Sequence, residues 1–178
     1  MRILACMTLL LVAGCGDGAA EQNVAATKAS SLTPGQWELT SEVTAFQTVD
    51  QGAPKIDTPV GTRATEQVCV GGGRPPAALF AGEGYRCNFD NYYLRNGRIN
   101  VTMQCAREDL SGTIPITVDG SFEAESLEYV RELRTVLASD GDVQITARVT
   151  GRRTGDCAPE AEGDNASNGQ EPSNAAAG

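Results

Sequence analysis

The side chains that could carry out chemistry in this 178-residue chain are acids and cysteines, because the sequence contains no histidine. That absence excludes Ser-His and Cys-His nucleophile pairs and imidazole metal ligands. A carboxylate-based hydrolase acting on glycan would need two acids about 5–10 Å apart. The candidate pairs are Glu38 with Glu42, and Glu66 with Asp90. Because Glu38 and Glu42 fall on the polar side of a predicted strand, we expect solvated charges there. We assign no catalytic, cofactor-binding or metal-binding residue.

The N-terminal residues combine one positive charge, an apolar run and a cysteine. Arg2 is followed by residues 3–13, which are apolar except for one threonine. This run is shorter than the ~20 residues that a membrane span needs, and it is typical of a secretory signal peptide. The sequence Val12-Ala13-Gly14-Cys15 resembles the lipobox of bacterial lipoproteins. The alternative is an ordinary signal peptide, over residues 1–14, with a cysteine near its cleavage site.

The resemblance to the lipobox implies that Cys15 is diacylated and becomes the first residue of the mature protein. Two acyl chains, palmitate among them, give lasting attachment, whereas a single chain anchors only marginally. Gly16 implies the outer membrane of a Gram-negative cell, because the inner-membrane retention signal usually has aspartate at that position, and Asp17 comes one place later. We predict a flexible tether over residues 15–31 and a disordered acidic tail over residues 158–178.

Four cysteines remain once Cys6 leaves with the leader and Cys15 takes the lipid. An even number of cysteines in an exported domain predicts two disulfides. The four are Cys69, Cys87, Cys105 and Cys157. A Cys₄ zinc site is the alternative, but such sites usually contain two close C-x₂₋₄-C pairs. The spacings here are 18, 18 and 52 residues, which favour disulfides.

Residues 32–157 supply enough chain for one domain with a single core. The formal net charge of the chain is −9, which predicts repulsion from nucleic acid and from anionic lipid surfaces. We therefore expect no nucleic-acid partner.

Alternation of apolar and polar residues is the dominant pattern in this domain, and it indicates strands with one buried face. Residues 37–45 and 143–149 show it most clearly, and the second stretch follows a turn predicted at Asp140-Gly141. Residues 60–70 alternate more weakly. Residues 77–80 predict one helical turn within a loop rich in Gly and Pro.

A hairpin is predicted around Asn96-Gly97, between residues 85–94 and 98–106. A two-residue turn would divide the apolar side chains between the two faces. A three-residue loop over 95–97 with Gly97 left-handed aligns them on one face and brings two thiols together. The pairs in that register are Cys87 with Cys105, Phe89 with Met103, Asn91 with Val101 and Tyr93 with Ile99. This register predicts a Cys87–Cys105 disulfide and leaves Cys69 to pair with Cys157.

Residues 113–122 keep their alternation through the turn dipeptide Asp119-Gly120, so we predict a continuous strand and a turn at residues 123–126. The next stretch, residues 127–137, has the composition of a helix but also fits a strand. As a strand it would place Tyr129 opposite Gly120, where the ring could cover the bare backbone. The pattern itself leaves both structures open.

Three features together resemble the domain of unknown function 3617 family of small exported bacterial proteins, many of which are lipoproteins. They are the sequence LTPGQWEL at residues 32–39, the four spaced cysteines, and GRRTGDC at residues 151–157. The resemblance covers most of residues 32–157 and implies a mostly β, antiparallel domain, which favours a strand over 127–137. We expect a strongly curved sheet or open barrel of about seven strands. The family implies no activity, catalytic residue or ligand.

These observations predict a lipid-anchored protein of the cell envelope, with its domain in the periplasm and a binding or structural role rather than an enzymatic one. Its expected partners are the membrane, through the lipid, and either another envelope protein or a small apolar ligand. The mouth of a curved sheet could hold such a ligand. Trp37 and Phe89 are candidates to line that pocket, although both are ordinary core residue types.

Overall fold

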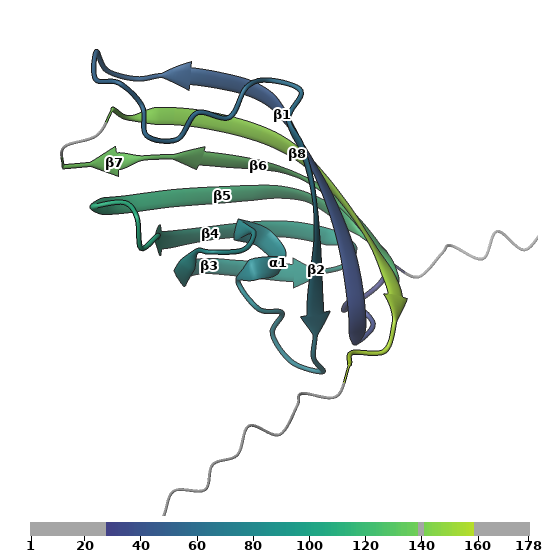
Figure 1. Ribbon diagram of the computed structural model, residues 1–178. Coiled ribbons are helices and arrows are strands. Elements are labelled where there is room, and N and C mark those ends of the chain that lie inside the picture. Colours follow the sequence, from purple (N-terminus) through teal and green to yellow (C-terminus); the bar gives the residue numbers. More distant parts are fainter. Residues whose placement is uncertain (1–27, 139–140, 159–178) are drawn as a thin grey trace, which may run out of the picture.

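The chain folds into one strongly curved antiparallel sheet that stays open, with β2 at one edge and β3 at the other (Figure 1). The computed structural model describes residues 28–138 and 141–158. Its strands are β1 (Gly35–Thr48), β2 (Arg63–Val70), β3 (Arg86–Arg95), β4 (Arg98–Ala106), β5 (Gly112–Phe122), β6 (Ser126–Arg134), β7 (Val136–Leu137) and β8 (Val143–Gly155). Their order is β2-β1-β8-β6-β5-β4-β3, and the short β7 pairs with β5. The predicted mostly β, antiparallel, open fold is confirmed.

Several predictions fall on residues outside this description. The predicted signal peptide, Cys15 and most of the predicted tether precede it, Asp140 lies in its internal gap, and all but the first residue of the predicted tail follow it. Within the described ranges, no helix has the length and apolar character needed to span a membrane.

The core lies on the concave face of the sheet, where alternate side chains of every long strand converge. Among the fully buried side chains are Trp37, Val101, Met103, Ile114, Ile116, Val118 and Val149. The single helix of the described chain, α1 (Ala78–Ala81), packs on this face and buries Leu79 and Phe80 (Figure 1). The predicted helical turn is therefore present, shifted by one residue.

Two side chains of β6 hold α1 against the sheet. The Tyr129 hydroxyl donates a 2.6 Å hydrogen bond to the Leu79 carbonyl, and the Arg131 guanidinium donates one of 2.8 Å to the Ala81 carbonyl. Burial raises the pKa of the Tyr129 phenol above its usual value. These bonds satisfy carbonyls of a helix too short to satisfy its own.

The three-residue loop predicted for the β3–β4 hairpin is wrong. The turn has two residues, Asn96 and Gly97, with φ of 54° and 69°. Asn-Gly suits this turn because both positions need positive φ. A bulge between Phe89 and Asn91 then shifts the register by one residue. The predicted pairs Cys87–Cys105 and Phe89–Met103 are correct, because they lie beyond the bulge.

Nearer the turn the two predicted pairs, Asn91 with Val101 and Tyr93 with Ile99, are wrong. Here the observed pairs are Asn91 with Thr102, Tyr92 with Val101, Tyr93 with Asn100 and Leu94 with Ile99. As a result Tyr92 packs against the core, and Tyr93 is 39% exposed.

The β5–β6 hairpin follows the prediction closely. β5 runs through Asp119 and Gly120, Phe122 pairs with Leu127 across the predicted turn, and Gly120 lies opposite Tyr129. The ambiguous stretch 127–137 is strand, divided between β6 and β7 at the buried Thr135. Glu128, Glu132 and Arg134 are exposed, whereas Arg131 is on the concave side. The three exposed charges reconcile a helix-like composition with a half-buried strand.

Two disulfides tie the sheet together. Cys87 and Cys105 are joined across β3 and β4 with a Cα–Cα distance of 4.0 Å. Cys69 in β2 is joined to Cys157, just beyond β8, with a Cα–Cα distance of 5.5 Å. The pairing is the one that the sequence predicts. The sulfurs form two separate pairs, so they do not make the alternative Cys₄ zinc site.

Candidate functional site

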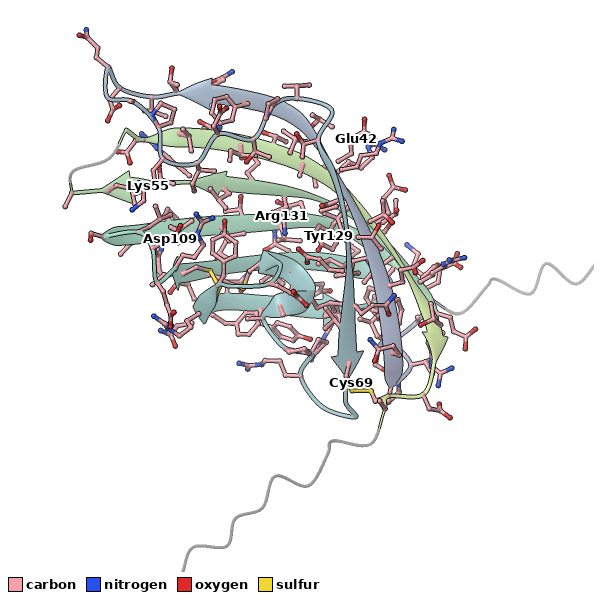
Figure 2. The ribbon with its side chains drawn as sticks, in the orientation of Figure 1. Glu42, Lys55, Cys69, Asp109, Tyr129 and Arg131 are labelled. Carbon is pink, nitrogen blue, oxygen red and sulfur yellow. A yellow bond between two sulfur atoms is a disulfide. The ribbon has the colours of Figure 1, made fainter. Side chains whose placement is uncertain are left out.

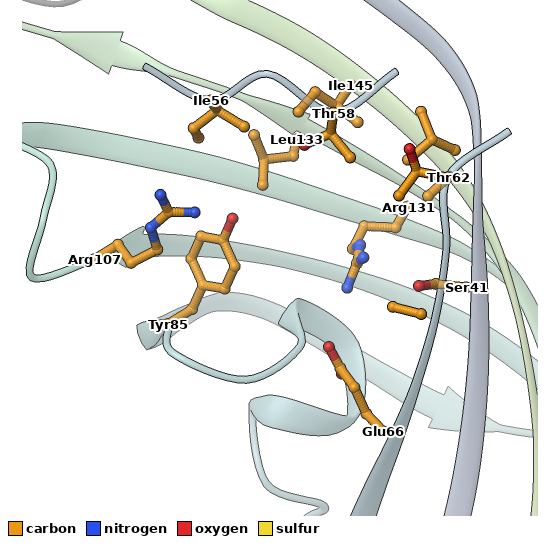
Figure 3. Close-up of a pocket in the computed structure, with 13 residues that line it drawn as sticks. Ser41, Ile56, Thr58, Thr62, Glu66, Tyr85, Arg107, Arg131, Leu133 and Ile145 are labelled. Carbon is orange, nitrogen blue, oxygen red and sulfur yellow. The ribbon is translucent and has the colours of Figure 1, made fainter. Parts of the chain in front are cut away.

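A cavity of about 160 Å³ lies on the concave face, between the sheet and the segment 49–62 that crosses it (Figure 3). Its floor is formed by residues of β1, β2, β6 and β8, and Ile56 and Thr58 of the crossing segment form its roof. Three small floor residues, Ser41, Ala64 and Ala147, occupy concave positions where other strands carry large apolar side chains. The open space follows from these small residues.

Strand alternation also brings two opposite charges to this floor. Glu66 in β2 pairs with the buried Leu39, and Arg131 in β6 pairs with the buried Val118. Directly opposite residues of an antiparallel pair share one face, so both charged side chains point to the concave side. Figure 3 shows them approaching each other from opposite sides of the cavity.

Glu66 and Arg131 meet at Gly82, the residue that follows α1. A Cβ at Gly82 would lie 3.1 Å from Arg131 Nη1 and 3.2 Å from Glu66 Oε1. The ion pairs within the described residues all have N–O distances of 2.8 Å or less, and none joins Glu66 to Arg131. The two charges therefore face the same small space without bonding each other.

The opposite wall of the cavity carries a charge that is already neutralised. Arg107 lies over the Tyr85 ring, 5.7 Å from its centroid, and binds the Asp109 carboxylate through hydrogen bonds of 2.6 and 2.7 Å. The hydrogen bond from Arg107 holds the pKa of Asp109 below its usual value and, reciprocally, raises the pKa of Arg107. Lys55 donates to the Asp109 carbonyl, which fixes the crossing segment beside this wall (Figure 2).

The carboxylate pairs proposed from the sequence are not brought together. Glu38 accepts a 2.7 Å hydrogen bond from Arg152, and Glu42 one of 2.8 Å from Arg63. Both lie on the convex face, and four residues of strand separate them by roughly 13 Å. Figure 2 shows Glu42 on the outer side of β1.

The second proposed pair is divided between the two faces of the sheet. Asp90 accepts a 3.1 Å hydrogen bond from Gln104, which is exposed on the convex side of β4. Glu66 is on the concave side, so it is the one acid among the residues that line the cavity. The arrangement offers a carboxylate and a guanidinium rather than two carboxylates.

Trp37 and Phe89, which were expected to line an apolar pocket, do not line this cavity. Trp37 is fully buried and donates a 3.1 Å hydrogen bond from Nε1 to the Thr33 carbonyl. Phe89 packs edge-on against Phe80 and Tyr92, with ring centroids 6.3 and 5.5 Å away. Both residues belong to the core, as their types alone would suggest.

Three residues that line the cavity were not predicted from the sequence, namely Arg131, Tyr85 and Arg107. One signal for Arg131 was present, because in a strand it falls on the same face as Tyr129 and Leu133, both of which are buried. A charged residue on a buried face marks a polar site inside the sheet. Nothing in the pattern indicated that residues 49–62 would cross the concave face and roof the cavity.

Comparison with known proteins identifies the family. No curated protein and no solved structure matches the chain. The family described as "Protein of unknown function (DUF3617)" matches residues 32–157, from the segment before β1 to the cysteine after β8. This match covers more than half of the chain and the whole sheet. The chain therefore belongs to the DUF3617 family.

Proposed function

We propose that this protein is a lipid-anchored, non-enzymatic binding module of the cell envelope, whose domain takes a small ligand in the concave cavity. The observation that carries the proposal is the cavity itself, with Glu66 and Arg131 facing it and no ion pair between them. A mostly apolar cavity with a few convergent polar groups is the usual form of a small-ligand site.

The size of the cavity limits the ligand. Its volume of about 160 Å³ is close to that of an engineered cavity that binds benzene. Sites for drug-sized ligands are larger, about 300–1,000 Å³. The ligand of this site is therefore a molecule of few non-hydrogen atoms, and an acyl chain or an oligosaccharide would not fit inside.

Binding also agrees better with the cavity than glycan hydrolysis does. A hydrolase of the two-carboxylate type needs a second acid facing Glu66. The group across from Glu66 is the Arg131 guanidinium, which stays protonated at neutral pH. That group can hold an anion but cannot serve as the second carboxyl group.

The anchor is tested by replacing Cys15 with alanine. Because the lipid is attached to the Cys15 thiol in this proposal, we expect Cys15→Ala to abolish incorporation of an alkyne-tagged palmitate analogue and to prevent lipoprotein processing. The label is measured on the immunoprecipitated protein from cells. Cys6→Ala is the matched control, since Cys6 lies within the predicted leader, and it should label normally. Label retained in Cys15→Ala would contradict the proposed anchor.

The cavity is tested by filling it. Ser41→Leu adds a larger apolar side chain to the floor, and we expect compounds that bind the full-length protein in detergent to lose at least tenfold in affinity. Ligand-observed NMR with a library of small polar and apolar compounds provides the measurement. Thr40→Leu is the matched control, because Thr40 is the exposed neighbour on the convex face.

Two results would contradict cavity binding. One is a set of compounds that bind wild type and Ser41→Leu equally, which would place their site elsewhere. The other is a folded wild-type protein that binds no compound of this size.

A further inference from the structure

We infer that the ligand of the concave cavity is a compact zwitterion, namely an α-amino acid with a small aliphatic side chain. Its carboxylate would bind Arg131 and its ammonium group would bind Glu66. This inference rests on the proposed function of the cavity and specifies the chemical class of its ligand.

Arg131 and Glu66 both retain hydrogen-bonding groups that a ligand can use. Arg131 uses Nη1 on the carbonyls of Ala81 and Phe80, at 2.8 and 3.5 Å. A guanidinium has five N–H donors in a planar fork, so Nε and Nη2 remain for an anion. Glu66 accepts no side-chain hydrogen bond from the described residues, which leaves both carboxylate oxygens for a cationic donor.

These groups are exposed to solvent and are not covered by packed atoms. Within the described ranges no buried side-chain nitrogen or oxygen lacks a hydrogen-bond partner. The unbonded atoms of Arg131 and Glu66 are therefore accessible to solvent in the cavity. A ligand can replace the water at these donors and acceptors without an internal ion pair having to break first.

The two charged groups lie close together. The point where a Gly82 Cβ would lie is 3.1 Å from Arg131 Nη1 and within 3.3 Å of both Glu66 oxygens. Arg131 Nη1 and Glu66 Oε1 are therefore at most about 6.3 Å apart. Gly82 has φ of 89°, a conformation that glycine adopts readily, and a side chain there would crowd both groups. A ligand that reaches both groups must carry its own two charges close together. An α-amino acid, with both charges on one carbon, meets that condition.

Part of the cavity wall is apolar. Val43, Ile56, Leu133 and Ile145 line the same cavity. They offer contact to a small aliphatic side chain, whereas the total volume of about 160 Å³ excludes a large one. Charge and volume together select a small aliphatic amino acid over a lone anion or a lone cation.

The test compares L-alanine with molecules that lack one of its features. Propionate lacks the ammonium group, isopropylamine lacks the carboxylate, and 4-aminobutyrate places its charges three carbons apart. By isothermal titration calorimetry on the full-length protein at pH 7, we expect L-alanine to bind at least tenfold more tightly than each of the three.

Two substitutions assign the ends of the ligand. Glu66→Gln should remove the preference for L-alanine over propionate, and Arg131→Gln should remove the preference over isopropylamine. Ratios of affinities are compared because Arg131→Gln also weakens the contact with α1, and Arg131→Lys, which retains the charge, should keep part of the preference. Arg148→Gln and Glu128→Gln are matched controls, because these residues form a 2.7 Å ion pair elsewhere, with both side chains more than half exposed. They should leave the ratios unchanged.

The failure of this inference is distinguishable from that of the proposed function. If propionate binds as tightly as L-alanine and Ser41→Leu abolishes both, the zwitterion is wrong and the cavity is a site for a small anion. If Glu66→Gln and Arg131→Gln leave all ratios unchanged, the two charges do not recognise the ligand. If none of the four molecules binds, or if all bind Ser41→Leu as they bind wild type, the inference falls; the compound library with Ser41→Leu then decides separately whether the cavity binds any other ligand.

Discussion

Replacing both Cys69 and Cys157 by serine should lower the free energy of unfolding by about 4.5 kcal/mol. Cys69 and Cys157 are 88 residues apart in the sequence, so their disulfide removes much of the conformational entropy of the unfolded chain. It also holds the edge strand β2 to the end of β8, across the intervening β1. Since domains of this size are stable by only about 5–15 kcal/mol, the loss takes a large share of the total. Urea unfolding of the oxidised wild type and the double variant measures it.

The second disulfide provides the control for this mechanism. Cys87 and Cys105 are 18 residues apart, and the same chain-entropy relation gives about 3 kcal/mol for their double serine variant. The order of the two effects is therefore the decisive result. A larger loss for Cys87→Ser with Cys105→Ser than for the long-range pair would show that loop closure is not what stabilises the domain.

The strands could be predicted because the sheet has one buried face. β5 and β8 alternate without interruption, so the period of two survives even through the turn dipeptide at Asp119. The disulfide pairing followed for the same reason, since Cys87 and Cys105 are opposite each other in the register that aligns the apolar face.

Bulges could not be predicted, because a bulge changes the face of every residue beyond it while leaving the composition unchanged. One bulge lies between Phe89 and Asn91, and the two-residue turn that the apolar pattern argued against is compatible with it. Another lies between Val43 and Ala45 in β1, and it turns Phe46 toward the core in place of Ala45.

The cavity could not be predicted from the sequence, for a different reason. It depends on contacts between segments that are distant in the chain, such as Lys55 with the Asp109 carbonyl. It also depends on small residues of three strands lying next to one another, which requires the strand order β2-β1-β8. Local patterns indicate which face of each strand is buried, whereas a hollow in that face is decided by which strands become neighbours.

Gly120→Ala should destabilise the domain by about 3 kcal/mol, because the added methyl group has no space. A Cβ at this position would overlap the Glu128 carbonyl oxygen and lie 2.5 Å from Tyr129 Cβ. Tyr129 cannot move aside cheaply, since its hydroxyl is bonded to the Leu79 carbonyl in α1. Gly155→Ala is the matched control: Gly155 also lies in a strand, nothing in the described chain comes within 4 Å of its Cβ position, and the change should stay within about 0.5 kcal/mol. Urea midpoints of the two variants give the comparison. Alanine is ordinarily better than glycine in a strand, so a loss of stability confined to Gly120→Ala can arise only from the close approach of β6. Equal urea midpoints for the two variants would mean that Tyr129 does not lie opposite Gly120.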